Sequence, residues 1–169
     1  MKRILSVVAL FGLSACMGGG DSSSSGPSVD LTPDAPDVAM NMQFETLLNG
    51  MRMGNDVTYD SDIGRAVQDH ANDMFERDYL SVSIQGDPMN RDIGDLVTAA
   101  GYTWSEILQL VEQGEFTLDE VLAEFDNTGA CGGGGQDLCI DDELFENFGI
   151  AKAGSGSDQK WVLVLASPG

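Results

Sequence analysis

Apolar residues recur every three or four positions in several stretches of the chain, which is the spacing of one face of a helix. The clearest stretch is residues 63–75, which follows Asp60 and Ser61, either of which suits an N-cap. We expect a helix there, and shorter helices at the other stretches with this spacing. These stretches are residues 44–51, 93–97 (ending at Gly101), 107–111 and 121–125.

Two of the shorter helices are expected to begin at a capping box. In this motif a Thr and a Glu three residues later each bond the other's backbone amide. Thr103 and Glu106 stand before the stretch at 107–111, and Thr117 and Glu120 stand before the stretch at 121–125. Both stretches are therefore predicted to be helical.

The pattern becomes strand-like near the end of the chain. Residues 145–153 and 160–166 are short apolar runs, and the second (KWVLVLA) is continuous, as in a strand buried on both faces. Residues 154–159 are rich in Gly, Ser and Asp, so we expect them to join the two strands as a hairpin. The expected fold class is α+β, with helices packed on a small antiparallel sheet. Its predicted core includes Phe44, Phe75, Phe125, Phe148 and Trp161.

Residues 1–15 have the pattern of an export signal. Two basic residues precede an apolar run at residues 4–13, which is shorter than the ~20 residues of a membrane-spanning helix. The letters LSAC at residues 13–16 resemble the lipobox of bacterial lipoprotein signals. The resemblance implies cleavage before Cys16 and attachment of a lipid to its thiol. The alternative is an ordinary secretory signal.

Residues 16–39 are predicted to be a flexible tether. The segment is rich in Gly, Ser, Pro and Asp, so it cannot bury enough apolar surface to offset the entropy of ordering. The remaining residues, 40–169, suffice for one core, and we expect them to form one domain.

The chain is strongly acidic, with a formal net charge of -20. Removing residues 1–15 takes away two basic residues and no acids, so the expected mature charge is -22. This charge repels nucleic acid and anionic lipid headgroups. We therefore expect no nucleic-acid partner, and attachment to a membrane through the N-terminal lipid alone.

Two cysteines remain if Cys16 carries a lipid. Cys131 and Cys139 are close in sequence, and in an oxidising periplasm such a pair favours a disulfide. Two cysteines and the chain's one histidine are too few ligands for a structural zinc site.

Several segments resemble, in their order and spacing, the CAP family, which is also called SCP-like. Asn49 and Arg52 fall in the first helix, and the family's A-x-x-H-A-x-x-M pattern falls on residues 67–74. The segments AAGYTWSEI, TLDEVLAEFDNTGAC and FENFGIAKAGSGSDQKWVLVLASP resemble later family elements. The resemblance covers residues 43–168 and implies an α-β-α sandwich with a central cleft.

In many CAP proteins two histidines and two acidic residues in that cleft hold a divalent metal. The resemblance places Val82 and Cys131 at the two histidine positions, and Gln109 at the position of one acid. The second acid is expected at Asp87 or Asp92. Because Val82 and Gln109 are poor metal ligands, we expect this metal site to be absent and no cofactor to be bound.

Three further residues are candidates for the cleft. His70 is the only histidine, and we expect it to be packed and hydrogen-bonded; the alternative is a general base working with Asp69 or Asp73. Tyr102 and Trp104 are candidates to line a pocket for an apolar or aromatic ligand, and the alternative is packing under a loop.

The segment at residues 126–143 is rich in Asp, Glu and Gly. Its carboxylates suit Ca²⁺, although it does not match an EF-hand loop. A solvated acidic loop is the expectation, and a weak Ca²⁺ site is the alternative.

Together these observations predict a lipid-anchored, extracytoplasmic CAP/SCP-like domain of a bacterial cell envelope, at the outer membrane. It is expected to bind a small apolar ligand or an envelope protein without catalysis. The alternatives are an envelope hydrolase, with or without a metal, and a calcium-stabilised adhesion module.

Overall fold

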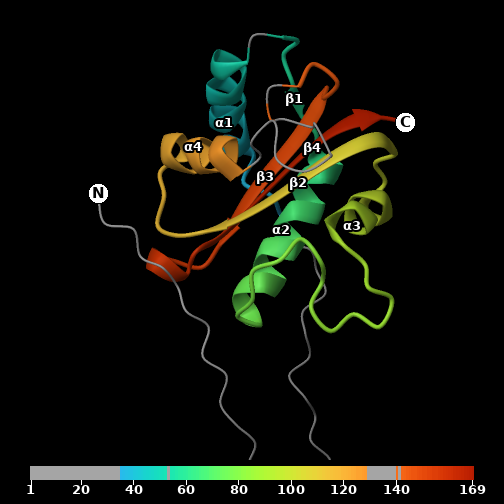
Figure 1. Ribbon diagram of the computed structural model, residues 1–169, viewed down its shortest axis with the longest axis vertical. Helices are drawn as coiled ribbons and strands as arrows, with labels where there is room; N and C mark the ends of the chain where they lie inside the picture. Colours follow the sequence, from blue (N-terminus) through green and yellow to red (C-terminus); the bar gives the residue numbers. More distant parts are fainter. Residues whose placement is uncertain (1–34, 53, 129–139, 141) are drawn as a thin grey trace, which may run out of the picture. The chain divides into compact units, whose positions relative to one another are not determined.

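The computed structural model describes residues 35–52, 54–128, 140 and 142–169. All of them belong to the compact unit Leu31–Gly169. The elements are labelled in Figure 1. Their order is α1 (Val38–Met51), β1 (Thr58–Tyr59), α2 (Ser61–Glu76), α3 (Ile93–Ala100), β2 (Trp104–Gln113), α4 (Leu118–Thr128), β3 (Asn147–Ala153), a 3₁₀ turn (Gly156–Asp158) and β4 (Lys160–Pro168). No helix in the described ranges is long and apolar enough to cross a membrane.

The strands form one sheet in the order β1-β3-β4-β2. The predicted hairpin is confirmed, because β3 and β4 pair antiparallel from Asn147↔Ala166 to Ala153↔Lys160. β2 is antiparallel to β4, whereas the short β1 is parallel to β3. The sheet is therefore mixed, and the expectation of a purely antiparallel sheet missed β1.

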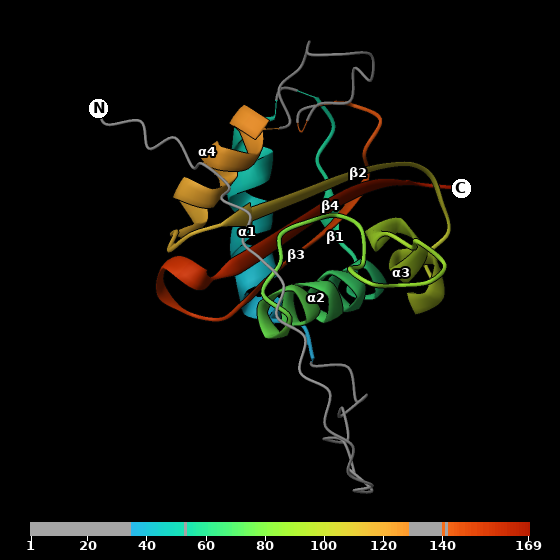
Figure 2. The ribbon, with the colours of Figure 1, turned by 60° about the horizontal axis from the view of Figure 1, so that its bottom comes forward.

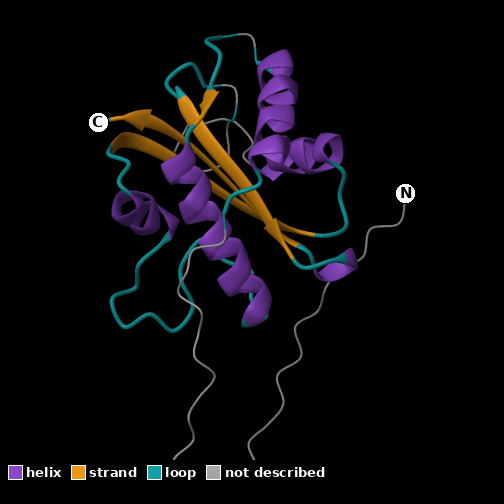
Figure 3. Cartoon of the chain, turned by 180° about the vertical axis from the view of Figure 1, so that it is seen from behind, coloured by secondary structure: helices purple, strands orange, loops and turns teal. Residues whose placement is uncertain are grey.

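Two helical layers cover the two faces of the sheet, as Figures 2 and 3 show. On one face α1 and α4 pack against Trp161, Leu163 and Leu165 of β4. On the other face α2 and α3 pack against Val162, Val164 and Ala166, the alternate residues of the same strand. Because successive side chains of a strand point to opposite faces, the continuous apolar run of β4 serves both layers. The expected α+β sandwich is confirmed.

The predicted helix at residues 107–111 is wrong, because this segment belongs to strand β2. Ile107 and Val111 pack towards α2 and α3, while Leu108 and Leu110 pack towards α1 and α4. A strand that contributes to two cores has an apolar run whose spacing also fits a short helix. Thr103 and Glu106 therefore do not form a capping box.

The starts of α2 and α4 follow the predicted chemistry, whereas the caps of α1 and α3 were not predicted. The side chain of Asp60 accepts hydrogen bonds from the second and third residues of α2. Thr117 and Glu120 form the predicted capping box, with Thr117 N donating to Glu120 Oε2 at 2.8 Å. α1 begins at Val38, two residues before the predicted start of the domain, after an Asp37 N-cap.

Phe75 is the predicted core residue that the structure places elsewhere, because 42% of its surface is exposed. It lies near the end of α2, and its ring covers Gly154 in the hairpin between β3 and β4. Phe75 fits the apolar spacing of residues 63–75, but in the structure it lies at the boundary between the buried and exposed faces of α2.

Candidate functional site

His70 lies in the buried face of α2 and is only 1% exposed. Its Nε2 lies 2.7 Å from the carbonyl oxygen of Ser81, in the loop after α2. Because a carbonyl can only accept, Nε2 carries the proton and Nδ1 is a bare acceptor. Nδ1 is buried and has no hydrogen-bond partner among the described residues. Neither predicted partner acid, Asp69 or Asp73, therefore bonds this nitrogen.

The environment keeps His70 neutral. Burial lowers the pKa of its imidazole, and this effect outweighs the hydrogen bond to Ser81 and the charges of Asp73 and Asp92, which raise it. The ring of Tyr79 packs edge-on against it, with centroids 6.0 Å apart. An enclosed, neutral imidazole without a bonded acid is poorly placed to act as a general base on a bound substrate.

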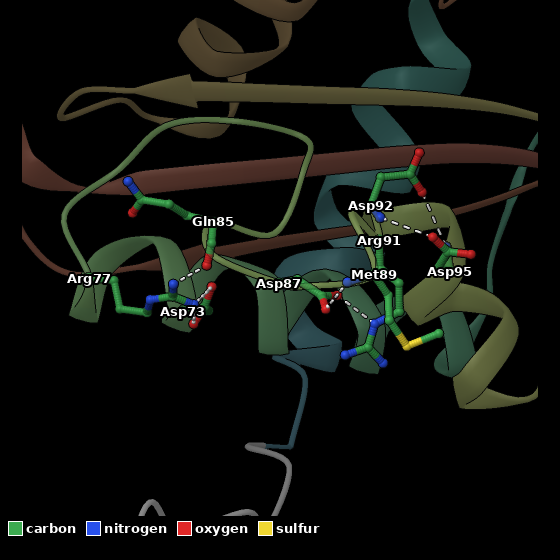
Figure 4. Close-up of polar contacts among 8 residues, drawn as sticks. All are labelled: Asp73, Arg77, Gln85, Asp87, Met89, Arg91, Asp92 and Asp95. Carbon is green, nitrogen blue, oxygen red and sulfur yellow. Dashed lines mark hydrogen bonds and ion pairs between the residues drawn. The ribbon is translucent and has the colours of Figure 1, made fainter.

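The loop after α2 is tied back to that helix by polar contacts around Asp73. The guanidinium of Arg77 bonds Asp73 Oδ1 at 3.1 Å and also donates to the carbonyl of Gln85, as Figure 4 shows. The hydroxyl of Tyr79 donates to the same carboxylate of Asp73. Burial, followed by that carboxylate, raises the pKa of the Tyr79 hydroxyl. Asp73 is thus used to hold the loop.

The two candidates for the family's second acid have structural roles. Asp87 accepts from Arg91 Nε at 2.6 Å and from Met89 N at 3.0 Å, and the bond to Arg91 lowers its pKa. Asp92 caps α3 and shares a reciprocal capping box with Asp95. Figure 4 shows both arrangements along the same loop. Their oxygens are therefore engaged by neighbouring residues of the loop and of α3.

The remaining described positions do not fit the metal that the resemblance implies. Val82 packs its hydrocarbon side chain against the core under α2 and α3. Gln109 has a buried Oε1 without a hydrogen-bond partner in the described ranges, but its carboxamide is neutral. Within those ranges no group of His, Cys, Asp or Glu side chains gathers in a way that suits a metal ion. Cys131, the fourth position, lies outside the described residues.

The polar atoms of Tyr102 and Trp104 form hydrogen bonds with other residues of the domain. The hydroxyl of Tyr102 donates to Asn147 Oδ1 at 2.8 Å, and burial is the main cause that raises its pKa to about 12. The indole Nε1 of Trp104 donates to Thr98 Oγ1 at 3.1 Å and to Gly94 O at 3.3 Å. Both side chains are half-buried against the core under α2 and α3. Tyr102 and Trp104 therefore pack within the domain, which was the alternative to lining a ligand pocket.

A hollow of about 490 Å³ lies on the other side of the sheet, between α1 and α4. It is lined by Gln43, Thr46, Leu47, Leu118 and Asp119. Leu47 and Leu118 also pack against the core beneath it, so the floor of the hollow is apolar. This hollow was not predicted from the sequence. The helical spacing that includes Leu47 was the available signal, but it does not show which helix lies opposite.

The other sequence-predicted sites lie outside the described residues. These are Cys16, the pair Cys131 and Cys139, and most of the acidic segment at 126–143. The lipid attachment, the disulfide and the Ca²⁺ alternative therefore remain predictions.

No protein-family model matches the chain, and no curated protein matches it. Several solved structures are similar in fold, among them the two that follow. An outer surface protein of Borrelia burgdorferi aligns with a TM-score of 0.60 at 11% identity, over 78% of this chain and 95% of that chain. An SCP-domain extracellular protein of Bacillus anthracis aligns with a TM-score of 0.57 at 14% identity, over 76% of this chain and 40% of that chain. Together with the sandwich described above, these similarities show that the chain has the CAP/SCP-type fold that its motifs predicted.

Proposed function

We propose that the chain is a lipid-anchored, extracytoplasmic binding domain that holds a small apolar ligand in the hollow between α1 and α4. The observation that carries this proposal is the hollow itself, with leucine side chains from both helices at its floor. Ligand pockets are typically concave and mostly apolar, with a few polar groups at the rim. Gln43, Thr46 and Asp119 supply such a rim.

Two observations favour binding over catalysis. His70 is enclosed and its Nε2 is committed to Ser81. Asp73, Asp87 and Asp92 each serve a local contact of the loop or of α3. A hydrolase would instead require acid and base groups that converge on a space open to substrate.

Charge restricts the class of ligand. Asp119 stands at the rim of the hollow, and the formal charge of the chain is -20. An anionic ligand would be repelled by this field, whereas a neutral one would not. A neutral apolar molecule, such as a long-chain alcohol or an uncharged lipid, therefore fits the hollow better than a fatty-acid anion.

The extracytoplasmic location has separate support. The Borrelia protein is described as an outer surface protein and the Bacillus protein as extracellular. The predicted export signal and lipobox at residues 1–16 agree with such a location. The proposed lipid on Cys16 would hold the domain at the outer membrane of the envelope.

The proposal is tested by displacement of Nile red, a neutral fluorescent dye, from the purified full-length protein. We expect dodecanol to displace the dye at lower concentration than dodecanoate does. Thr46→Trp, which fills the hollow from its exposed rim, should abolish dye binding. Met42→Trp is the matched control, because Met42 is 63% exposed on the same helix and does not line the hollow.

The proposal fails if Thr46→Trp and Met42→Trp bind the dye equally well. If dodecanoate displaces the dye at lower concentration than dodecanol does, the proposal of a neutral ligand is wrong.

A further inference from the structure

The two outer edges of the sheet differ in whether their outward backbone groups have hydrogen-bond partners. On the β3 side, backbone groups that point outward at Glu146, Phe148 and Ile150 have hydrogen-bond partners. The bonds run from Thr58 N to Glu146 O (2.9 Å), from Asp60 N to Phe148 O (2.9 Å), and from Ile150 N to Asn41 Oδ1 (2.9 Å). Asn41 thus covers the position that β1 is too short to reach. This edge of the sheet cannot accept another strand.

The outer edge of β2 has no such cover among the described residues. Gly114 N donates to Gln159 O at 3.0 Å, next to the last pair of the β2–β4 ladder. Hydrogen-bonded pairs alternate with non-bonded pairs along an antiparallel ladder. Counting back from Gly114, the backbone amides and carbonyls of Leu110 and Leu108 point towards β4. The amides and carbonyls of Ile107, Gln109 and Val111 therefore point away from the sheet. In the described ranges these groups have no hydrogen-bond partner.

Proteins usually protect an exposed edge strand from pairing with β-bulges, charged residues or proline. In β2 such features lie only at the two ends of the strand. A β-bulge interrupts the register between Trp104 and Glu106, and Glu106 and Glu112 supply the charges of the strand. Between them the sequence ILQLV contains no charge and no proline, and its register with β4 is continuous. An open, regular and apolar edge of this kind is a template for an added strand.

We propose that residues 107–111 of β2 form a docking edge for an extended, basic segment of a second protein, which joins the sheet beside β2. The backbone groups of Ile107, Gln109 and Val111 would supply the hydrogen bonds of such a strand addition. Charge selects the partner, because the carboxylate of Glu106 stands beside the edge. The chain as a whole contains 28 acidic and 8 basic residues. A lysine or arginine side chain of the guest strand would lie beside the carboxylate of Glu106.

The same charges oppose pairing between two copies of this chain. In the two-fold antiparallel arrangement centred on Gln109, Glu106 of each copy would stand directly opposite Glu112 of the other. Like charges in opposed positions are destabilising. Two chains with a net charge of -20 also repel each other at long range.

Amide hydrogen exchange on the full-length protein tests the proposal. In the protein alone, the amides of Ile107, Gln109 and Val111 should exchange much faster than those of Leu108 and Leu110. The probe is a synthetic peptide in which valine and lysine alternate, long enough to pair with residues 106–112. At saturation it should slow the three outward amides about tenfold or more. A peptide with the same side chains but N-methylated backbone amides should not.

A charge variant separates strand addition from general attraction. Glu106→Lys should weaken binding of the lysine peptide and strengthen binding of its glutamate counterpart. Glu76→Lys is the control, since it makes the same charge change at an exposed position of α2. Three results would overturn the proposal: slow exchange of the outward amides in the dilute protein without peptide, no protection by the lysine peptide at millimolar concentration, or equal binding of the N-methylated peptide. Protection that appears only at high protein concentration would instead identify a second copy as the occupant.

Discussion

The carboxamide of Asn41 in α1 pairs with the backbone of Ile150 in β3 as another peptide unit would. Its Oδ1 accepts from Ile150 N and its Nδ2 donates to Ile150 O, each at 2.9 Å. Both residues are fully buried. The pair continues the edge of β1 and fixes α1 on the sheet, so it also positions the α1 side of the hollow.

Replacing Asn41 with Ala should destabilise the domain by about 2–4 kcal/mol, because two buried backbone groups of Ile150 would lose their partners. Urea unfolding of the full-length protein measures this. Asn127→Ala removes a bond from Asn127 Nδ2 to Ala123 O on the exposed side of α4, and it should cost less than about 0.5 kcal/mol. Equal costs for the two variants would mean that the Asn41 pair is not important for stability.

Replacement by alanine should destabilise the domain at Gly149 but not at Gly50. A Cβ on Gly149 would lie 2.7 Å from the backbone nitrogen of Gly64 and 2.9 Å from the carbonyl carbon of Ile63, so β3 and α2 would have to separate. We expect Gly149→Ala to cost about 1–3 kcal/mol. A Cβ on Gly50 in α1 meets nothing within 4 Å, so Gly50→Ala should be neutral or stabilise by up to about 1 kcal/mol. Thermal unfolding of the two variants compares them, and a stabilising Gly149→Ala would refute the close approach of α2 to β3.

Acidification should weaken the fold through His70. Its pKa is lowered in the folded protein, so the unfolded chain takes up the proton first. The stabilising effect of the neutral, buried imidazole is therefore complete above the unfolded pKa of about 6.5 and is lost as the pH falls below it. The loss is at most about 1.4 kcal/mol per pH unit for one proton.

Unfolding free energies of the wild type and His70→Gln between pH 7.5 and pH 5 isolate this effect, since the carboxylates are common to both proteins. The wild type should lose stability relative to the variant on acidification. A constant difference across this range would show that His70 does not titrate differently in the folded state.

Cys16 should determine whether the protein enters a membrane. In cells that export and lipidate proteins, the wild type should partition into the detergent phase of Triton X-114, and Cys16→Ser should remain in the aqueous phase. Cys131→Ser should behave as the wild type, because its thiol is not expected to carry a lipid. Detergent partitioning of Cys16→Ser would contradict lipid attachment at this residue.

The sequence predicts elements well where one local pattern determines them. α2 has a continuous apolar face and a carboxylate cap at Asp60, and the strands of the hairpin are separated by a turn-rich segment. β2 was predicted as a helix because Ile107, Leu108 and Val111 fit helical spacing, and only its pairing with β4 determines that it is a strand. β1 has only two residues and leaves no periodic signal.

The candidate site was harder to predict than the fold. The hollow joins Leu47 of α1 with Leu118 of α4, and no local pattern indicates that these helices are neighbours. The roles of Asp73, Asp87 and Asp92 depend on how the loop after α2 folds back. The absence of the family's metal site stays a prediction, and it rests on the side-chain chemistry of Val82 and Gln109, which are poor metal ligands in any packing.

Native mass spectrometry of the full-length protein, gently extracted from cells, distinguishes binding of an apolar ligand from binding of a metal ion. We predict a neutral apolar molecule bound to the wild type and to Met42→Trp, which is absent from Thr46→Trp, and no stoichiometric divalent metal. A stoichiometric metal ion on the wild type, with no apolar molecule bound, would show that the domain is a metal-binding protein and that the hollow does not hold an apolar ligand.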